Sequence, residues 1–273
     1  MFEYDRSLPL DVQVTGTEKR GEVTVSDITY AAPDGRRTAA YLVAPGGDGP
    51  FAAILYVHWY EPPKPSSGRT EFLEEAVAMA RKGVVSLLPE TMWSPHEWYD
   101  TRNRADDYDA TVRQIVDLRR ALDVLLAQRG VDPGRVAVVG HDFGGMFGAI
   151  LAGVDGRAQS YVIMGSTPQF ADWYLFGPPM EDDAKARYVA RIAELDPVRH
   201  IRNANGAAFL FQFGSQDEFV PEDKVAEFVG AAPGTPRVEW YDAIHELDVE
   251  QAHADRTAWL DERLGLLTHT RAA

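Results

Sequence analysis

Three side chains suited to nucleophilic catalysis lie in separate parts of this chain of 273 residues: Asp142, Asp217 and His245. Asp142 lies in the sequence Gly-His-Asp-Phe-Gly at 140–144, which follows an apolar run at 136–139 and precedes residues that can begin a helix. A reactive residue between two glycines, in a turn from strand to helix, is typical of the nucleophile elbow G-x-S-x-G. Because aspartate occupies the serine position, we expect Asp142 to be the nucleophile.

An aspartate at this position favours a different reaction from a serine. A carboxylate attacking an ester would form a high-energy mixed anhydride, whereas its attack on an sp3 carbon with a leaving group forms an ordinary alkyl ester. Asp142 therefore predicts the opening of an epoxide ring or the displacement of a halide, through a covalent intermediate.

Two later loops supply the partners that such a nucleophile needs. Asp217 follows the apolar run at 207–213, and His245 follows the run at 238–241. Each residue lies just past the carboxyl end of an expected strand, and histidine is suited to general base catalysis near neutral pH. The chain order nucleophile, acid, base predicts a catalytic triad of Asp142, Asp217 and His245.

The elements that position these residues can be predicted from hydrophobic patterns. The expected strands are 22–31, 38–44, 51–57, 84–88, 135–139, 160–164, 207–213 and 238–241. The first two form an antiparallel hairpin around a Pro-Asp-Gly turn. Helical patterns alternate with the later strands and predict a mainly parallel sheet with helices on both faces. We expect a single α/β domain over 1–273, with a small lid at about 167–200, where the alternation breaks.

Composition limits the expected partners and location. The chain has 27 Lys and Arg against 42 Asp and Glu, a net charge of −15, which disfavours nucleic acid and anionic membranes as partners. It has no cysteine, and no apolar run approaches the ~20 residues of a membrane span. Its N-terminus lacks a signal-peptide pattern. We therefore expect a cytoplasmic protein with a small-molecule substrate, and a homodimer is left open.

The elbow at 140–145, the acid loop at 214–221 and the loop of His245 together resemble the α/β-hydrolase superfamily, and most closely its dienelactone-hydrolase-like branch. The resemblance implies the α/β-hydrolase fold with an eight-stranded sheet, and no metal or organic cofactor. That branch uses a Ser or Cys nucleophile. With Asp142 in that place, the chain is similar instead to the epoxide hydrolases and the haloalkane and haloacid dehalogenases, which share the fold.

The same resemblance implies an oxyanion hole. In the superfamily, the turn after the strand at 51–57 supplies one backbone amide, and the residue after the nucleophile supplies another. We expect these donors to be the N–H groups of Trp59 and Phe143. They would stabilise the negative charge that develops when water attacks the alkyl ester of Asp142.

Aromatic pairs in three loops predict a largely apolar pocket over the elbow. The expected substrate-binding residues are His58, Tyr60, Trp98, Tyr99, Trp173 and Tyr174. Tyr174, with Tyr99 and Tyr60 as alternatives, could protonate an epoxide oxygen. The ring N–H groups of Trp173, Trp98 and His58 could instead hold a halide. We prefer the epoxide, because Phe143 stands where many haloalkane dehalogenases have tryptophan.

Three alternatives remain open from the sequence. The enzyme could be a dehalogenase. It could hydrolyse esters or lactones, as dienelactone hydrolases do, with Asp142 as a base that activates water. It could also be a ligand-binding protein that kept the fold after losing its serine, although this does not explain why Asp217 and His245 remain in triad positions.

Overall fold

The computed structural model describes residues 1–60 and 68–266, and within them one mixed sheet of nine strands runs through the molecule in the order β1-β2-β3-β5-β4-β6-β7-β8-β9. The strands are β1 (Gln13–Arg20), β2 (Val23–Ala31), β3 (Arg37–Ala44), β4 (Phe51–Val57), β5 (Val84–Pro89), β6 (Val131–His141), β7 (Ser160–Met164), β8 (Ala208–Gly214) and β9 (Arg237–Tyr241). Strands β1 to β3 pair antiparallel, as does β3 with β5, and the remaining neighbours are parallel. The predicted hairpin is β2 and β3.

The expectation of eight strands was one too few. The additional strand is β1, which pairs with β2 at the edge of the sheet. Its sequence, QVTGTEKR, is polar and mostly exposed. Because neither of its faces is buried, β1 lacks the apolar alternation that identifies a half-buried strand.

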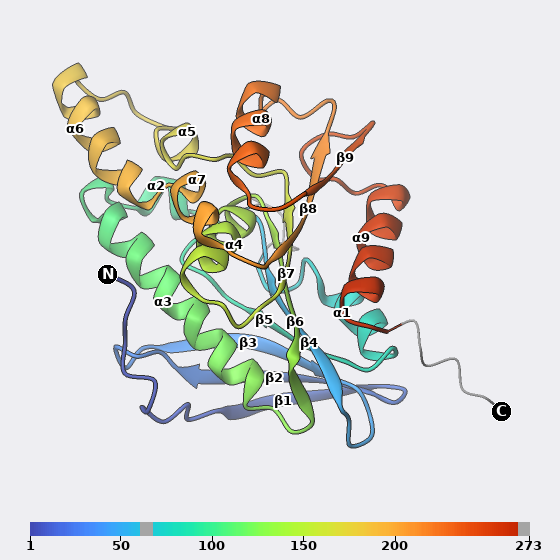
Figure 1. Cartoon of the computed structure of the whole chain (residues 1–273). Coiled ribbons are helices and arrows are strands. Elements are labelled where there is room, and N and C mark those ends of the chain that lie inside the picture. The colour runs from blue at the N-terminus through green and yellow to red at the C-terminus, as the bar shows by residue number, and fades with distance from the viewer. Residues whose placement is uncertain (61–67, 267–273) are drawn as a thin grey trace.

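Helices cover both faces of the sheet (Figure 1). They are α1 (Leu73–Ala80), α2 (Trp98–Thr101), α3 (Asp107–Leu126), α4 (Phe143–Val154), α5 (Ala171–Tyr174), α6 (Asp182–Ile192), α7 (Pro197–His200), α8 (Glu222–Ala231) and α9 (Glu250–Arg263). One buried cluster joins α3, α4 and α8 to the sheet, and a second joins α1 and α9 to its opposite face. The predicted arrangement of a mainly parallel sheet between helices is therefore confirmed.

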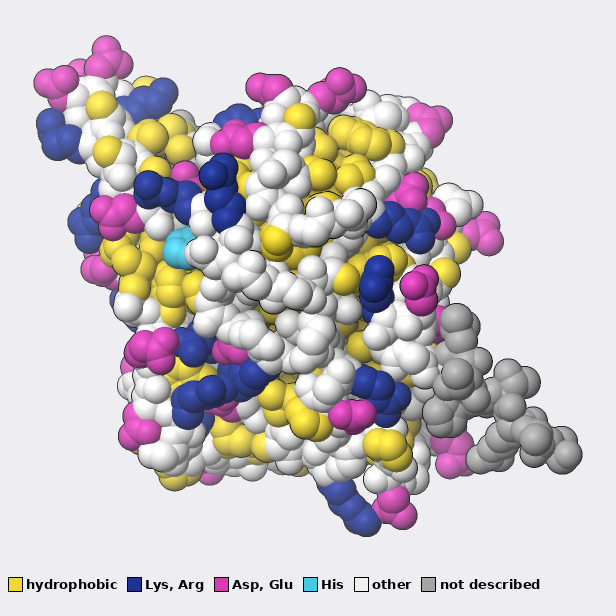
Figure 2. Space-filling view, in the orientation of Figure 1, with side chains coloured by type: hydrophobic (Ala, Val, Ile, Leu, Met, Phe, Trp, Pro, Cys, Tyr) yellow, Lys and Arg dark blue, Asp and Glu magenta, His cyan; other side chains and the backbone are white. Residues whose placement is uncertain are grey.

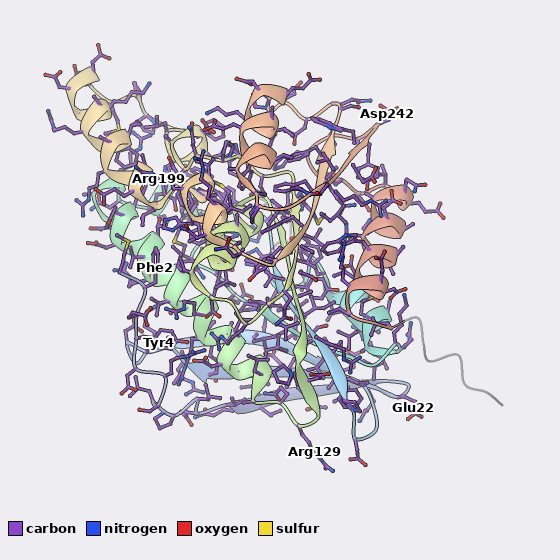
Figure 3. All side chains as sticks on the ribbon, in the orientation of Figure 1. Phe2, Tyr4, Glu22, Arg129, Arg199 and Asp242 are labelled. Atoms are coloured by element: carbon purple, nitrogen blue, oxygen red, sulfur yellow. The ribbon has the colours of Figure 1, made fainter. Side chains whose placement is uncertain are left out.

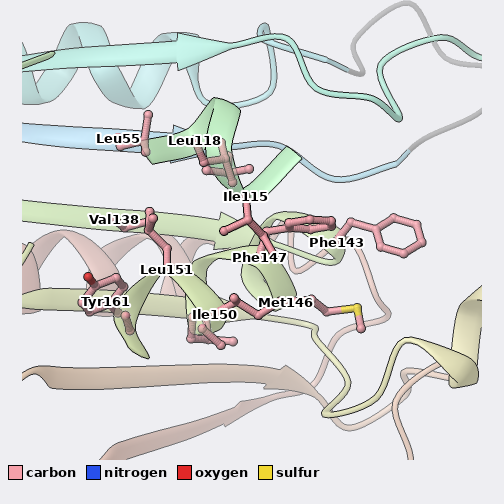
Figure 4. Close-up of a cluster of buried hydrophobic side chains, with 14 of the residues drawn as sticks. Leu55, Ile115, Leu118, Val138, Phe143, Met146, Phe147, Ile150, Leu151 and Tyr161 are labelled. Carbon is pink, nitrogen blue, oxygen red and sulfur yellow. The ribbon is translucent and has the colours of Figure 1, made fainter. Parts of the chain in front are cut away.

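The core centres on β4, β6 and α4. All seven residues of β4 are buried, as expected for a strand covered on both faces. Helix α4 is buried along almost its whole length. Figure 4 shows its side chains beside Ile115 and Leu118 of α3. This packing fixes the helix that begins at the predicted nucleophile.

The N-terminal segment lies along the outer side of α3 (Figure 3). The Phe2 carbonyl accepts a hydrogen bond from Arg119, and the Tyr4 hydroxyl donates to Asp123 over 2.7 Å. The buried Arg120 donates to the carbonyl oxygens of Leu8 and Pro9. These contacts join the start of the chain to the helical layer.

The segment predicted as a lid, 167–200, contains α5, α6 and α7. Figure 1 shows α6 projecting from the body of the molecule, whereas α5 lies closer to the sheet. Figure 2 shows acidic and basic side chains interspersed on the visible face, so the excess of negative charge forms no single patch there. No helix in the described part of the chain is both long and apolar enough to cross a membrane. That the segment 167–200 acts as a lid, and that residues 1–273 form a single domain, both stay predictions.

Candidate active site

The nucleophile elbow is a strained turn between β6 and α4. Asp142 has φ +56° and ψ −119°, a conformation that costs energy for any residue with a side chain. Gly140 and Gly144 permit the turn: a Cβ on Gly144 would lie 2.0 Å from the Val57 carbonyl oxygen, and one on Gly140 would lie 2.2 Å from the Gly144 oxygen. The strain is offset by the buried packing of α4, and it projects Asp142 from the carboxyl edge of the sheet.

The structure brings the three predicted triad residues together. His245 Nδ1 lies 2.7 Å from Asp217 Oδ2, a hydrogen bond between the loops after β9 and β8. On the other side of the ring, His245 Nε2 lies 3.7 Å from Asp142 Oδ1, an ionic contact longer than a hydrogen bond. Asp217 is itself oriented, since its Oδ1 accepts the Phe219 N–H over 2.7 Å. The imidazole thus lies between two carboxylates.

This arrangement determines the protonation of His245. Burial alone would lower the pKa of the imidazole, but the Asp142 and Asp217 carboxylates raise it to about 9. At neutral pH the ring is therefore protonated. A protonated His245 has no free ring nitrogen to accept a proton, and removal of one of the two negative charges would lower its pKa and favour loss of the proton it holds.

The oxyanion-hole prediction is half wrong. The Trp59 N–H does not point to the nucleophile; it donates to Glu71 Oε2 over 2.7 Å. The next amide takes its place, with the Tyr60 N–H donating to Asp142 Oδ2 over 2.9 Å. Phe143 remains available as the second donor, because the first residue of a helix has no intrahelical acceptor for its N–H.

Sequence reasoning missed the pair Glu71 and His141, which connects two loops of the site. His141 Nδ1 lies 2.7 Å from Glu71 Oε1, and its Nε2 lies 3.0 Å from the carbonyl oxygen of His245. The Trp59 ring stacks on His141 with 5.0 Å between centroids. Glu71 therefore contacts both the turn that carries the Tyr60 amide and the residue that supports His245. Position 71 falls in a stretch that reads as ordinary helix, so no sequence signal marked it.

A cavity of about 640 Å³ opens over the triad. Its lining residues are Trp59, Tyr60, Tyr99, Asp142, Phe143, Trp173, Phe176, Gln216, Glu218, Phe219, Ile244, His245 and Glu246. Of the predicted substrate-binding residues, Tyr60, Tyr99 and Trp173 line it. Trp98 lies behind this wall, with its ring 5.3 Å from that of Phe143. The residues that the prediction missed come from loops after α5, β8 and β9, whose convergence depends on the fold.

Like Trp98, the predicted substrate-binding residues His58 and Tyr174 do not line the cavity. His58 is buried, and its Nε2 is within hydrogen-bond distance of Ser94 Oγ and Thr91 Oγ1 at 2.8 and 2.9 Å. Tyr174 is fully buried, and its hydroxyl pairs with Thr111 Oγ1 at 2.8 Å. Both predictions were wrong, because these side chains satisfy core polar groups instead of facing the elbow.

Tyr99 is a partly buried tyrosine of the cavity wall. Its hydroxyl donates to the Trp173 carbonyl over 3.4 Å, a long and weak bond. Burial, and then the charge of Asp142, raise the pKa of Tyr99 well above its ordinary value. Its hydroxyl therefore keeps its proton and is a hydrogen-bond donor at every physiological pH.

No group of three or more His, Asp or Glu side chains suited to a metal ion occurs within residues 1–60 and 68–266. The expectation that no metal or organic cofactor takes part stays a prediction.

Comparison with known proteins identifies the fold. No protein-family model matches the sequence, and no curated protein matches it. An acetyl xylan esterase from Paenibacillus sp. R4 superposes with a TM-score of 0.76 at 18% identity, covering 94% of this chain and 90% of the other. Acetyl xylan esterase 1 from a Thermoanaerobacterium species gives 0.78 at 16% identity, covering 96% and 89%. A protein assigned as a dienelactone hydrolase, from Klebsiella pneumoniae, gives 0.65 at 17% identity, covering 90% and 99%.

These similarities, together with the sheet order and the elbow, show that the chain has the α/β-hydrolase fold. The fold alone does not determine the reaction, because one fold carries many activities. The reaction has to be inferred from the residues of the site.

Proposed function

We propose that the protein is a hydrolase that acts on a small organic substrate through Asp142, His245 and Asp217. Asp142 is its nucleophile and attacks an sp3 carbon that carries a leaving group. The observation that carries this proposal is the hydrogen bond from the Tyr60 N–H to Asp142 Oδ2. An oxyanion hole normally receives the oxygen on which negative charge develops. Here that position is already filled by the carboxylate of the residue at the elbow.

The geometry suits a reaction in two steps. In the first, one Asp142 oxygen attacks carbon, and the bond from that carbon to the leaving group breaks. In the second, His245 takes a proton from water, and the resulting hydroxide attacks the carboxyl carbon of Asp142. The negative charge that then develops on the ester carbonyl oxygen is stabilised by the Tyr60 and Phe143 amides. Cleavage of the ester bond, with the proton passed from His245 to the departing oxygen, releases an alcohol and leaves Asp142 as a carboxylic acid. Loss of its proton to water restores the Asp142 carboxylate.

The charges of the site support this sequence of steps. While Asp142 is ionised, it helps to hold the pKa of His245 at about 9. Formation of the ester removes that negative charge, so the pKa of His245 falls toward its ordinary range and the ring gives up its extra proton to bulk water. Neutral His245 can then act as the base. The base is therefore released only when there is an ester to hydrolyse.

The leaving group is an epoxide oxygen or a halide. For the epoxide, Tyr99 replaces Tyr174 as the proton donor, because Tyr99 lines the cavity and Tyr174 does not. A halide would need ring N–H donors, and of the three candidates Trp173 alone lines the cavity, with its indole N–H directed to the Phe219 carbonyl at 3.3 Å. The epoxide is thus favoured over the halide.

Ester or lactone hydrolysis is the second candidate, and the structural similarities favour it. The three proteins compared above carry the names of acetyl xylan esterases and a dienelactone hydrolase. In this reaction Asp142 would act as a base on water, and no covalent adduct would form. Asp142 would then have to leave the Tyr60 amide free for the substrate carbonyl.

Intact-protein mass spectrometry of His245→Gln separates these candidates. The variant is mixed with panels of small epoxides, haloalkanes, and esters or lactones. A gain equal to the whole epoxide, or to a haloalkane minus hydrogen halide, supports the covalent route. The double variant Asp142→Asn/His245→Gln is the control and should gain no mass. Turnover of esters by the wild type without any adduct would instead support the second candidate.

A further inference from the structure

The walls of the active-site cavity carry negative charge. Asp142, Glu218 and Glu246 line it, and of its described lining residues none is Lys or Arg. His245 is the one lining side chain that can be positively charged, and it lies between Asp142 and Asp217. An anionic group entering this cavity would lose its hydration without gaining a free cationic partner, which is strongly unfavourable.

The same cavity is lined by aromatic rings. They belong to Trp59, Tyr60, Tyr99, Phe143, Trp173, Phe176 and Phe219. The face of an aromatic ring is negative, so aromatic walls attract organic cations. Rings and carboxylates together therefore favour a ligand of positive charge.

Side chains at the rim of the cavity could bind a positively charged group. Phe219 and Ile244 are about half exposed, at 51% and 53%, and Phe176 is 46% exposed. Glu218 is exposed in the loop after β8, next to Phe219 in the chain, and lines the same cavity. A substrate lying between the elbow and this rim would place one end near Asp142 and its other end near a carboxylate among apolar side chains.

The arginine behind the aromatic wall does not reverse this charge pattern. The Arg102 guanidinium lies 5.1 Å from the centre of the Tyr99 ring. It forms an ion pair with Asp107 at 2.6 Å and a hydrogen bond with the Tyr174 carbonyl. Its charge is thus paired with that of Asp107, and Arg102 does not line the cavity.

We propose that the substrate carries a positively charged amine at the end opposite its reactive carbon, and that Glu218 and the aromatic rim bind this amine. The reactive-carbon part of this statement rests on the function proposed above. The preference for a positively charged ligand does not rest on that function, because it follows from the lining residues alone. Substrates that carry a carboxylate, including haloacids, are excluded.

Calorimetric titration of the full-length protein tests the charge preference with three unreactive ligands of similar shape: benzylammonium, benzyl alcohol and benzoate. We expect benzylammonium to bind most tightly and benzoate to bind least. Glu218→Gln should weaken benzylammonium by about 2-fold to 5-fold, the usual worth of an exposed ion pair. The same substitution should leave benzyl alcohol unchanged. Glu262→Gln, on the exposed side of α9 outside the cavity, is the matched control and should change neither.

Binding of benzoate as tight as that of benzylammonium would overturn the proposal, and so would failure of all three ligands to bind. If Glu218→Gln and Glu262→Gln changed the affinity for benzylammonium equally, Glu218 would not be the residue that binds the amine. These outcomes differ from failure of the proposed function, in which benzylammonium binds as expected but no reactive probe of any charge forms an adduct with His245→Gln.

Discussion

At the scale of single residues, the two oxygens of Asp142 have different surroundings. Oδ2 accepts the Tyr60 N–H, and Oδ1 faces the His245 ring at 3.7 Å. One oxygen is thus held where negative charge is stabilised, and the other lies on the side of the base. This division is what a carboxylate needs to serve first as a nucleophile and then as the carbonyl of an ester.

The charge of Asp142 should be visible in the titration of His245. Because Asp142 and Asp217 together raise the pKa of His245 to about 9, Asp142→Asn should lower that pKa toward the ordinary ~6.5. Titration of the imidazole C–H signals by NMR measures it directly. An unchanged pKa of His245 in Asp142→Asn would mean that the charge of Asp142 does not raise that pKa. The proposal that ester formation lowers the pKa of His245 would then be wrong.

The same shift has a consequence for stability. A histidine whose folded pKa is raised stabilises the protein fully below its unfolded pKa, near 6.5, and loses this contribution as the pH rises through about 9. The free energy of unfolding of the wild type, relative to His245→Gln, should therefore fall between these two pH values. Urea denaturation at pH 6 and pH 9.5 provides the comparison.

At the scale of elements, the site is assembled from loops at the carboxyl ends of β4, β6, β8 and β9. Glu71 and His141 connect the first of these loops to the last. Glu71 accepts the Trp59 N–H through Oε2, and its Oε1 lies 2.7 Å from His141 Nδ1. Glu71 thereby determines which amide of the β4 loop turns toward Asp142.

We predict that Glu71→Ala slows decay of the alkyl-enzyme by about 10-fold to 100-fold, somewhat less than loss of an oxyanion donor. Its formation should slow much less, because Asp142 itself is held by the elbow. Glu71→Gln is the matched variant. Its amide oxygen can accept the Trp59 N–H, and its NH₂ can donate to His141 Nδ1, so it should retain most of the activity. Single-turnover mass spectrometry measures both steps, and equal slowing of both would indicate only a structural role.

At the scale of the whole molecule, the sequence predicts what depends on local patterns. Buried strands such as β4 have continuous apolar runs, and the elbow has its two glycines, so the sheet and the triad order could be predicted. The edge strand β1 could not, because its polar sequence forms no buried face.

Details that depend on contacts between distant segments could not be predicted from the sequence either. The choice of Tyr60 over Trp59 as the amide donor depends on Glu71, which lies 12 residues beyond Trp59. Tyr174 could be assigned to the core only once Thr111 of α3 was seen beside it. The negative rim of the cavity joins loops after β8 and β9, whose side chains have no shared pattern in the chain.

The measurement that most directly tests the account is a single turnover in H₂¹⁸O of the first substrate found with the His245→Gln variant. If Asp142 is the nucleophile, the wild-type enzyme gains ¹⁸O in the peptide that contains Asp142, and the first product contains no ¹⁸O. If Asp142 instead activates water that attacks the substrate, the label appears in the product and none enters Asp142. The second result would contradict the central claim.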